Sequence, residues 1–219
     1  MDSIKRNYQI LEKRMIEQTD ISLNYGKALI ETELDTGILN VIVKPIVKAF
    51  YKHWSENAKA GTLVQIKVTL DSAKEFLTDA DGSKEHFERI INRNFPKYLE
   101  NDQTNIQCRP NHRNYQKLKD VTKKCFITQV EESILFLKVD KEVNDYSDLS
   151  KATFQTKEDA YQALKRQLDY NEEGIMIVEK DDSILNVLLG KDVIIKVLRK
   201  GFELTKEKLL EELDEIFSN

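Results

Sequence analysis

Glycine, proline and cysteine are scarce in this sequence. Its 219 residues include seven glycines, three prolines and two cysteines. This composition excludes collagen-like and low-complexity chains and favours helices over an all-β meander. Cys108 and Cys125 form neither a CxxC pair nor a disulfide framework, and the first residues lack the pattern of a signal peptide. We therefore expect a cytoplasmic protein, or one assembled within a particle made in the cytoplasm.

Long apolar runs are also missing. The longest, residues 38 to 51, is interrupted by Asn40, Lys44, Pro45 and Lys48. It falls far short of the roughly 20 residues that a membrane span needs, so we expect a soluble protein without a membrane partner. The net charge of -4 is too close to balance to predict a general nucleic-acid binder. Any function of that kind must depend on a local patch.

Complete catalytic, metal and nucleotide motifs are absent from the sequence. His53, His86 and His112 are scattered, and none begins an HxxxH or HExxH pattern. The sequence contains no GxSxG, no phosphate loop and no GxGxxG. We therefore expect no catalytic residue, no metal and no cofactor, and we keep an enzyme of unrecognised type as the third hypothesis.

Two incomplete motifs favour turns over chemistry. Asp35-Thr36-Gly37 matches the tripeptide of aspartic proteases, but the sequence has one copy where the mechanism needs two carboxylates. Asp79 and Glu88 occupy positions three and twelve of an EF-hand calcium loop, but position one is Leu77. We interpret both as turns at the ends of helices.

The most apolar stretch, residues 172 to 217, is where we expect the core to form first. Its last part predicts an amphipathic helix with Thr205 as the N-cap, because apolar residues repeat at the helical period and acidic residues take the other face. Residues 183 to 200 fit a helix that ends before Gly201 or a hairpin that turns at Gly190-Lys191. We favour the helix slightly and keep both.

Helices are also predicted elsewhere in the chain. They cover residues 2 to 18, residues 45 to 60 up to Gly61, residues 71 to 77, residues 83 to 95 before Pro96, and a segment capped by Thr156. Ser83 is the predicted N-cap of the segment that it begins.

Strands are predicted where apolar residues alternate with polar ones or form short β-rich runs. The clearest is residues 64 to 70, where Thr69 would lie on the wet face. The others are residues 38 to 43, a hairpin over residues 125 to 139, and residues 175 to 178. We therefore expect an α+β fold, a small and mainly antiparallel sheet with amphipathic helices packed on it. The alternative to a single unit is two lobes, residues 1 to 105 and 106 to 219.

Three groups of residues are candidates for an interaction surface. The first is an apolar seam on the N-terminal helix, which would pack on the core of this chain or on a neighbouring subunit: Ile4, Tyr8, Leu11 and Met15. The second is a basic span with a net charge of +5 over residues 109 to 124: Arg109, Arg113, Lys117, Lys119, Lys123 and Lys124. The third is the acidic face of the C-terminal helix: Glu211, Glu212, Asp214 and Glu215.

Opposite charges on different parts of one chain favour contacts between unlike surfaces. We therefore expect a non-enzymatic structural or interaction subunit of a larger protein assembly, such as that of a virus or mobile element. Its partners would be other protein subunits, in a homo-oligomer or a multi-protein assembly. The alternative hypothesis is a nucleic-acid-binding protein that uses the basic span, with Tyr115 stacking on single-stranded bases.

Overall fold

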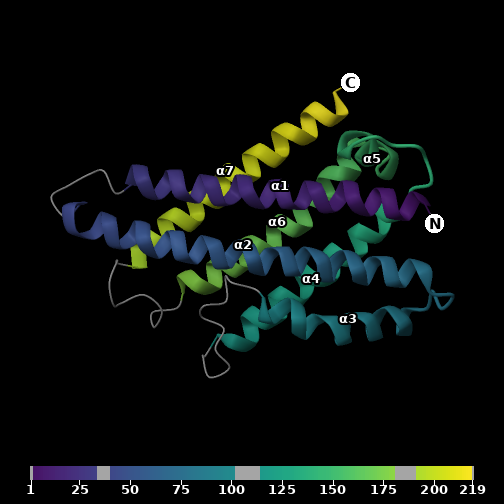
Figure 1. Cartoon of the computed structure of the whole chain (residues 1–219), viewed down its shortest axis with the longest axis horizontal. Coiled ribbons are helices and arrows are strands. Elements are labelled where there is room, and N and C mark those ends of the chain that lie inside the picture. Colours follow the sequence, from purple (N-terminus) through teal and green to yellow (C-terminus); the bar gives the residue numbers. More distant parts are fainter. Residues whose placement is uncertain (1, 34–39, 102–113, 181–190, 219) are drawn as a thin grey trace.

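The computed structural model describes residues 2–33, 40–101, 114–180 and 191–218, and these residues form seven helices and no strand (Figure 1). The helices are α1 (Asp2–Glu33), α2 (Asn40–Thr78), α3 (Lys84–Glu100), α4 (Tyr115–Leu137), α5 (Tyr146–Thr153), α6 (Lys157–Glu179) and α7 (Lys191–Phe217). The expected α+β fold is therefore wrong, because the described part of the chain is all-α.

The predicted strands lie inside helices. Residues 40–43 and 64–70 belong to α2, residues 125–137 to α4 and residues 175–178 to α6. Residues 38 and 39 lie outside the described residues, as does the boundary at 105 and 106 between the two suggested lobes. The division into lobes stays a prediction.

Helix α2 shows why alternation of apolar residues was misleading. Thr69 and Leu70 are both fully buried, although a strand with one wet face would expose the first of them. Helices α1, α3 and α4 all contact α2. Since successive residues of a surrounded helix face different neighbours, burial spreads around it and the 3.6-residue period is lost from the sequence.

Two of the predicted helix starts are confirmed. The hydroxyl of Ser83 accepts a hydrogen bond from the backbone N–H of His86 at 3.1 Å. The hydroxyl of Thr156 accepts one from the N–H of Asp159, also at 3.1 Å. Each hydroxyl therefore satisfies a donor that the first turn of a helix leaves without a partner.

Other predicted boundaries are wrong. Thr205 lies within α7, and its hydroxyl donates to the carbonyl of Gly201 at 2.8 Å, so it is not a cap. Helix α2 continues through Gly61, and α3 continues past Pro96 to Glu100. Of residues 183–200, those from 191 onward are helical, and the rest lie outside the described residues.

Four helices form a closed ring. Helix α1 contacts α4, α4 contacts α6, α6 contacts α7, and α7 contacts α1. The short α5 contacts α1, α4 and α7, and it lies near the N-terminal end of α1 (Figure 1). Side chains in the middle of such a ring face one another, which is where helical bundles build binding sites.

Helices α2 and α3 pack against this ring through two apolar clusters. One cluster joins α2, α3 and α4 around Phe126, which is fully buried against Phe95 and Tyr98. The other joins α1, α2, α4 and α5 around Leu70 and Leu149. Both clusters draw on α2 and α4, so these two helices form the centre of the molecule.

Asn7 ties the start of α1 to the end of α4. Its side chain is fully buried, and its amide nitrogen donates to the carbonyl oxygens of Phe136 at 3.2 Å and Val139 at 2.8 Å. Carbonyl groups at a helix C-terminus lack partners within the helix. The amide of Asn7 supplies a hydrogen-bond donor to this end of α4 from a position about 130 residues away in the sequence.

Within the described ranges, none of the helices has a stretch both long enough and apolar enough to cross a membrane.

Candidate functional site

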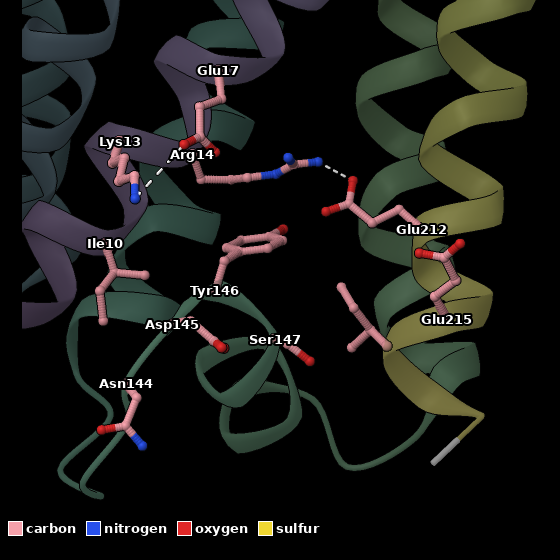
Figure 2. A pocket seen from close by; sticks show the side chains of 11 residues that line it. Ile10, Lys13, Arg14, Glu17, Asn144, Asp145, Tyr146, Ser147, Glu212 and Glu215 are labelled. Atoms are coloured by element: carbon pink, nitrogen blue, oxygen red, sulfur yellow. Dashed lines mark hydrogen bonds and ion pairs between the residues drawn. The ribbon is translucent and has the colours of Figure 1, made fainter.

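Two neighbouring cavities lie at the end of the ring that α5 covers. The inner cavity has a volume of about 150 Å³ and is lined by side chains of α1, α4, α5, α6 and α7. The outer cavity, about 430 Å³, is bordered by α1, α5 with the residues before it, and α7 (Figure 2). Arg14, Tyr146, Glu212 and Ile216 line both cavities and so separate them.

Arg14 crosses the boundary between the cavities. It reaches from α1 to Glu212 on α7 and donates a hydrogen bond to that carboxylate, with its guanidinium 5.3 Å from the centre of the Tyr146 ring (Figure 2). Burial lowers the pKa of Arg14 from its usual value. Its Nε is buried without a hydrogen-bond partner among the described residues. Arg14 therefore retains one buried donor beyond its ion pair.

Glu132, in the middle of α4, is the most unusual residue of the inner cavity. Only 6% of the surface of Glu132 is exposed to solvent. One carboxyl oxygen, Oε2, accepts a hydrogen bond from the amide of Gln167 on α6. The other, Oε1, has no hydrogen-bond partner in the described part of the chain, and the Nη2 of Arg166 lies 3.7 Å from it.

The environment of Glu132 favours its neutral form. Burial raises the pKa of this carboxyl from 4.5 to about 7, although Gln167 and Arg166 both act to lower it. Removing a carboxylate from water costs more free energy than these two contacts return. Glu132 is therefore divided between its two protonation states near neutral pH.

The wall of the inner cavity is largely aromatic and aliphatic. The ring of Phe136 lies 5.9 Å from that of Tyr146 and 5.5 Å from that of Phe154, measured between centroids. Leu11 and Ala163 add buried aliphatic surface from α1 and α6. The cavity thus combines one polar end, at Glu132, with an apolar wall.

The N-terminal seam packs on the core of this chain. Leu11 is buried in the cluster around Leu70, and Tyr8 and Met15 pack against the same cluster. Ile4 is half-buried. The packed part of the seam is therefore not free to dock on a neighbouring subunit.

The structure describes only part of the basic span. Arg109 and Arg113 lie outside the described residues, and Lys117 is exposed on α4. Lys119 lies over the ring of Tyr115, Lys123 donates to Asn92, and Lys124 approaches Glu173 at 3.9 Å. The nucleic-acid hypothesis stays a prediction.

Several charges of the acidic face are paired within the chain. Asp214 lies 2.6 Å from Lys157, Glu211 lies 3.6 Å from Lys208, and Glu212 binds Arg14. Glu215 is exposed at the border of the outer cavity. Charge on this face is therefore partly neutralised without a partner molecule.

The two incomplete motifs have different outcomes. Asp79 and Asp81 accept backbone hydrogen bonds from Asp81 and Ser83, which confirms a turn between α2 and α3. The described residues contain no group of three histidine, cysteine or acidic side chains arranged to hold a metal ion. Asp35-Thr36-Gly37 lies outside the described residues.

Of the residues named from the sequence, Leu11, Met15 and Glu212 line the inner cavity, but Arg14 and Glu132 were missed. The sequence analysis placed Glu132 within the predicted hairpin over residues 125 to 139 and assigned it no role. A signal was present: on a helix, Glu132 precedes Leu135 by three residues and Phe136 by four, which puts a carboxyl group on the same face as two apolar side chains. An acidic residue within such a stripe marks either a structural ion pair or a binding site.

Comparisons with known proteins give no relative: no protein family, no curated protein and no solved structure matches this chain.

Proposed function

We propose that this protein is a ligand-binding protein that holds a small molecule in the inner cavity. The observation that carries the proposal is Oε1 of Glu132, a carboxyl oxygen that accepts no hydrogen bond from any described residue, in a residue that is 6% exposed. Buried polar groups in folded proteins almost always have hydrogen-bond partners, because leaving one unpaired costs about 1–3 kcal/mol or more. A ligand that supplies the missing donor would recover this free energy.

The shape of the site supports the same function. Cavities between the helices of a bundle are common binding sites, and they combine an apolar wall with a few polar groups that orient the ligand. Here Glu132 and Arg14 are the polar groups, and the outer cavity gives a route from solvent as far as the side chains of Arg14 and Glu212.

The experiment is a fragment screen followed by protein NMR on the intact chain. Ligands should shift amide resonances around Ser133 and Gln167, which line the inner cavity from α4 and α6. Ala163→Phe fills the cavity and should abolish these shifts, whereas Ala60→Phe, at an exposed position of α2, should leave them unchanged. Melting curves check that both variants fold. A screen without shifts at this site in the wild type refutes the proposed function.

An interaction subunit, as expected from the sequence, is the second candidate. Ile21 on α1 and Leu204 on α7 are large apolar residues that are 36% exposed, on helices that contact each other. Apolar side chains on adjoining helices can contribute to a protein interface. Light scattering on the wild type and on an Ile21→Ser, Leu204→Ser double variant tests this candidate. A wild type that remains monomeric at high concentration and low salt counts against self-association.

A further inference from the structure

The charges around the inner cavity indicate which ligand it accepts. Arg14 and Glu212 form a pair, so their charges offset each other. Oε1 of Glu132 lies 3.7 Å from the Nη2 of Arg166. The side chain of Arg166 is 53% exposed to solvent. Solvent screens a cation that is so exposed. Ionised Glu132 therefore leaves the cavity with negative charge that is only partly compensated.

The hydrogen bonds lead to the same conclusion. Within the part of the chain that the structure describes, Oε1 of Glu132 accepts no hydrogen bond, whereas Oε2 accepts one from the amide of Gln167. A carboxylate is an acceptor only, so the group that completes it must donate. A donor that carries a positive charge gives a stronger bond than a neutral one and also offsets the buried charge.

The aromatic wall suits a cation as well. Phe136, Tyr146 and Phe154 line the cavity together with Glu132. The face of an aromatic ring attracts cations within about 6 Å of its centre, and the attraction grows when both groups are out of water. These rings can contact both the cationic group and the apolar body to which it is attached.

An anionic ligand fits less well. The guanidinium of Arg14 is occupied by Glu212, and its Nε offers a single N–H. A ligand carboxylate placed there would add a negative charge to a cavity that already contains Glu132 and Glu212. Like charges within a low-dielectric space repel strongly.

We infer that the inner cavity binds a small organic ammonium ion, whose charged nitrogen donates to Oε1 of Glu132 and whose apolar body packs against Phe136, Tyr146 and Phe154. The inference rests on the proposed function and names its class of ligand. A cavity of about 150 Å³ accommodates a molecule about the size of benzene. An arylalkylamine or a short branched alkylamine meets this limit.

Calorimetric titration with benzylamine, benzyl alcohol and benzoate on the full chain tests the inference. The three probes share one ring and differ in the charge of the attached group. At about pH 7.5 alkylamines are protonated, and benzylamine should then bind at least about 10-fold more tightly than the other two probes. Glu132→Gln keeps the size of the side chain and should reduce benzylamine affinity by a similar factor. Glu56→Gln, at an exposed position of α2 outside the residues that line the cavity, is the matched control and should bind as the wild type does.

A second measurement covers the case in which Glu132→Gln fails to fold. A cation favours the ionised form of Glu132, so binding should release about half a proton per ligand near pH 7, where the carboxyl is half protonated. Titration of the wild type in two buffers with different heats of ionisation measures this release.

The remaining outcomes overturn the inference. Equal binding of benzyl alcohol, unaffected by Glu132→Gln, would mean that the cavity accepts ligands without selecting a cation, and the proposed function would stand. Tighter binding of benzoate would assign the site to anions. If none of the three probes binds, the inference fails, and the fragment screen decides the proposed function separately.

Discussion

The buried carboxyl of Glu132 makes the stability of the protein depend on pH. Its pKa is about 7 in the folded protein and 4.5 when exposed. The folded state therefore retains the proton over a range in which the unfolded chain has released it. The stabilising contribution is fully present below pH 4.5 and is lost as the pH rises through about 7. The pKa in the folded protein exceeds that in the unfolded chain by about 2.5, which corresponds to about 3 kcal/mol in the free energy of unfolding. Solvent screening reduces this value little, because the side chain of Glu132 is only 8% exposed.

The assay is urea denaturation of the wild type and of Glu132→Gln at about pH 5 and about pH 8. The variant cannot titrate at this position, so its free energy of unfolding minus that of the wild type should be about 2.5 kcal/mol larger at the higher pH than at the lower, because only the wild type loses stability over this range. Comparing the two proteins at each pH removes the effects of all other titrating groups. Glu56→Gln, at an exposed position of α2, should show no such change with pH. A constant difference between wild type and Glu132→Gln across this range would refute the reasoning.

Three further predictions concern a buried amide, two hydroxyl groups of helices and an ion pair. Asn7→Leu removes the donor for carbonyl groups at the end of α4 and should destabilise by about 1–3 kcal/mol in urea denaturation. Ser83→Ala removes a cap and should cost about 1 kcal/mol, whereas Thr205→Ala, within α7, should change stability by less than about 0.5 kcal/mol, both measured by thermal unfolding. Glu212→Gln leaves the charge of Arg14 without its partner and should destabilise by about 1–3 kcal/mol, with the loss measured in urea at low and high salt.

The parts of the fold that could be predicted are those decided by a few neighbouring residues. The caps at Ser83 and Thr156 depend on a hydroxyl and a backbone N–H three residues later, so the sequence contains all the information needed. Residues 64–70 depend instead on the helices that surround α2, and their alternation of apolar residues does not distinguish a strand from a buried helix. Thr205 resembles a cap in sequence, but α7 already includes the turn before it.

The candidate site could not be predicted because its residues come from distant segments. Arg14 meets Glu212 across 198 positions of sequence, and Glu132 meets Gln167 across 35. No short motif joins them, and the position of Glu132 beside apolar residues is recognised only when residues 125–137 are read as a helix. The partial calcium loop around Asp79 is the opposite case. Its residues are close in sequence and resemble a motif, but in the structure they form an ordinary turn.

The closure of the ring by α1 and α7 has a consequence for the order of folding. Contacts between segments so far apart in the chain carry a large loss of chain entropy, so they form after the local pairing of α2 with α3 and of α6 with its neighbours. The inner cavity is therefore completed late, when α7 docks on α1. The same contacts are the first to separate in partial unfolding, and the amides of α7 should exchange with solvent faster than those of α4. A bound ligand that contacts both sides of the seam would hold the first and last helices together and slow that exchange.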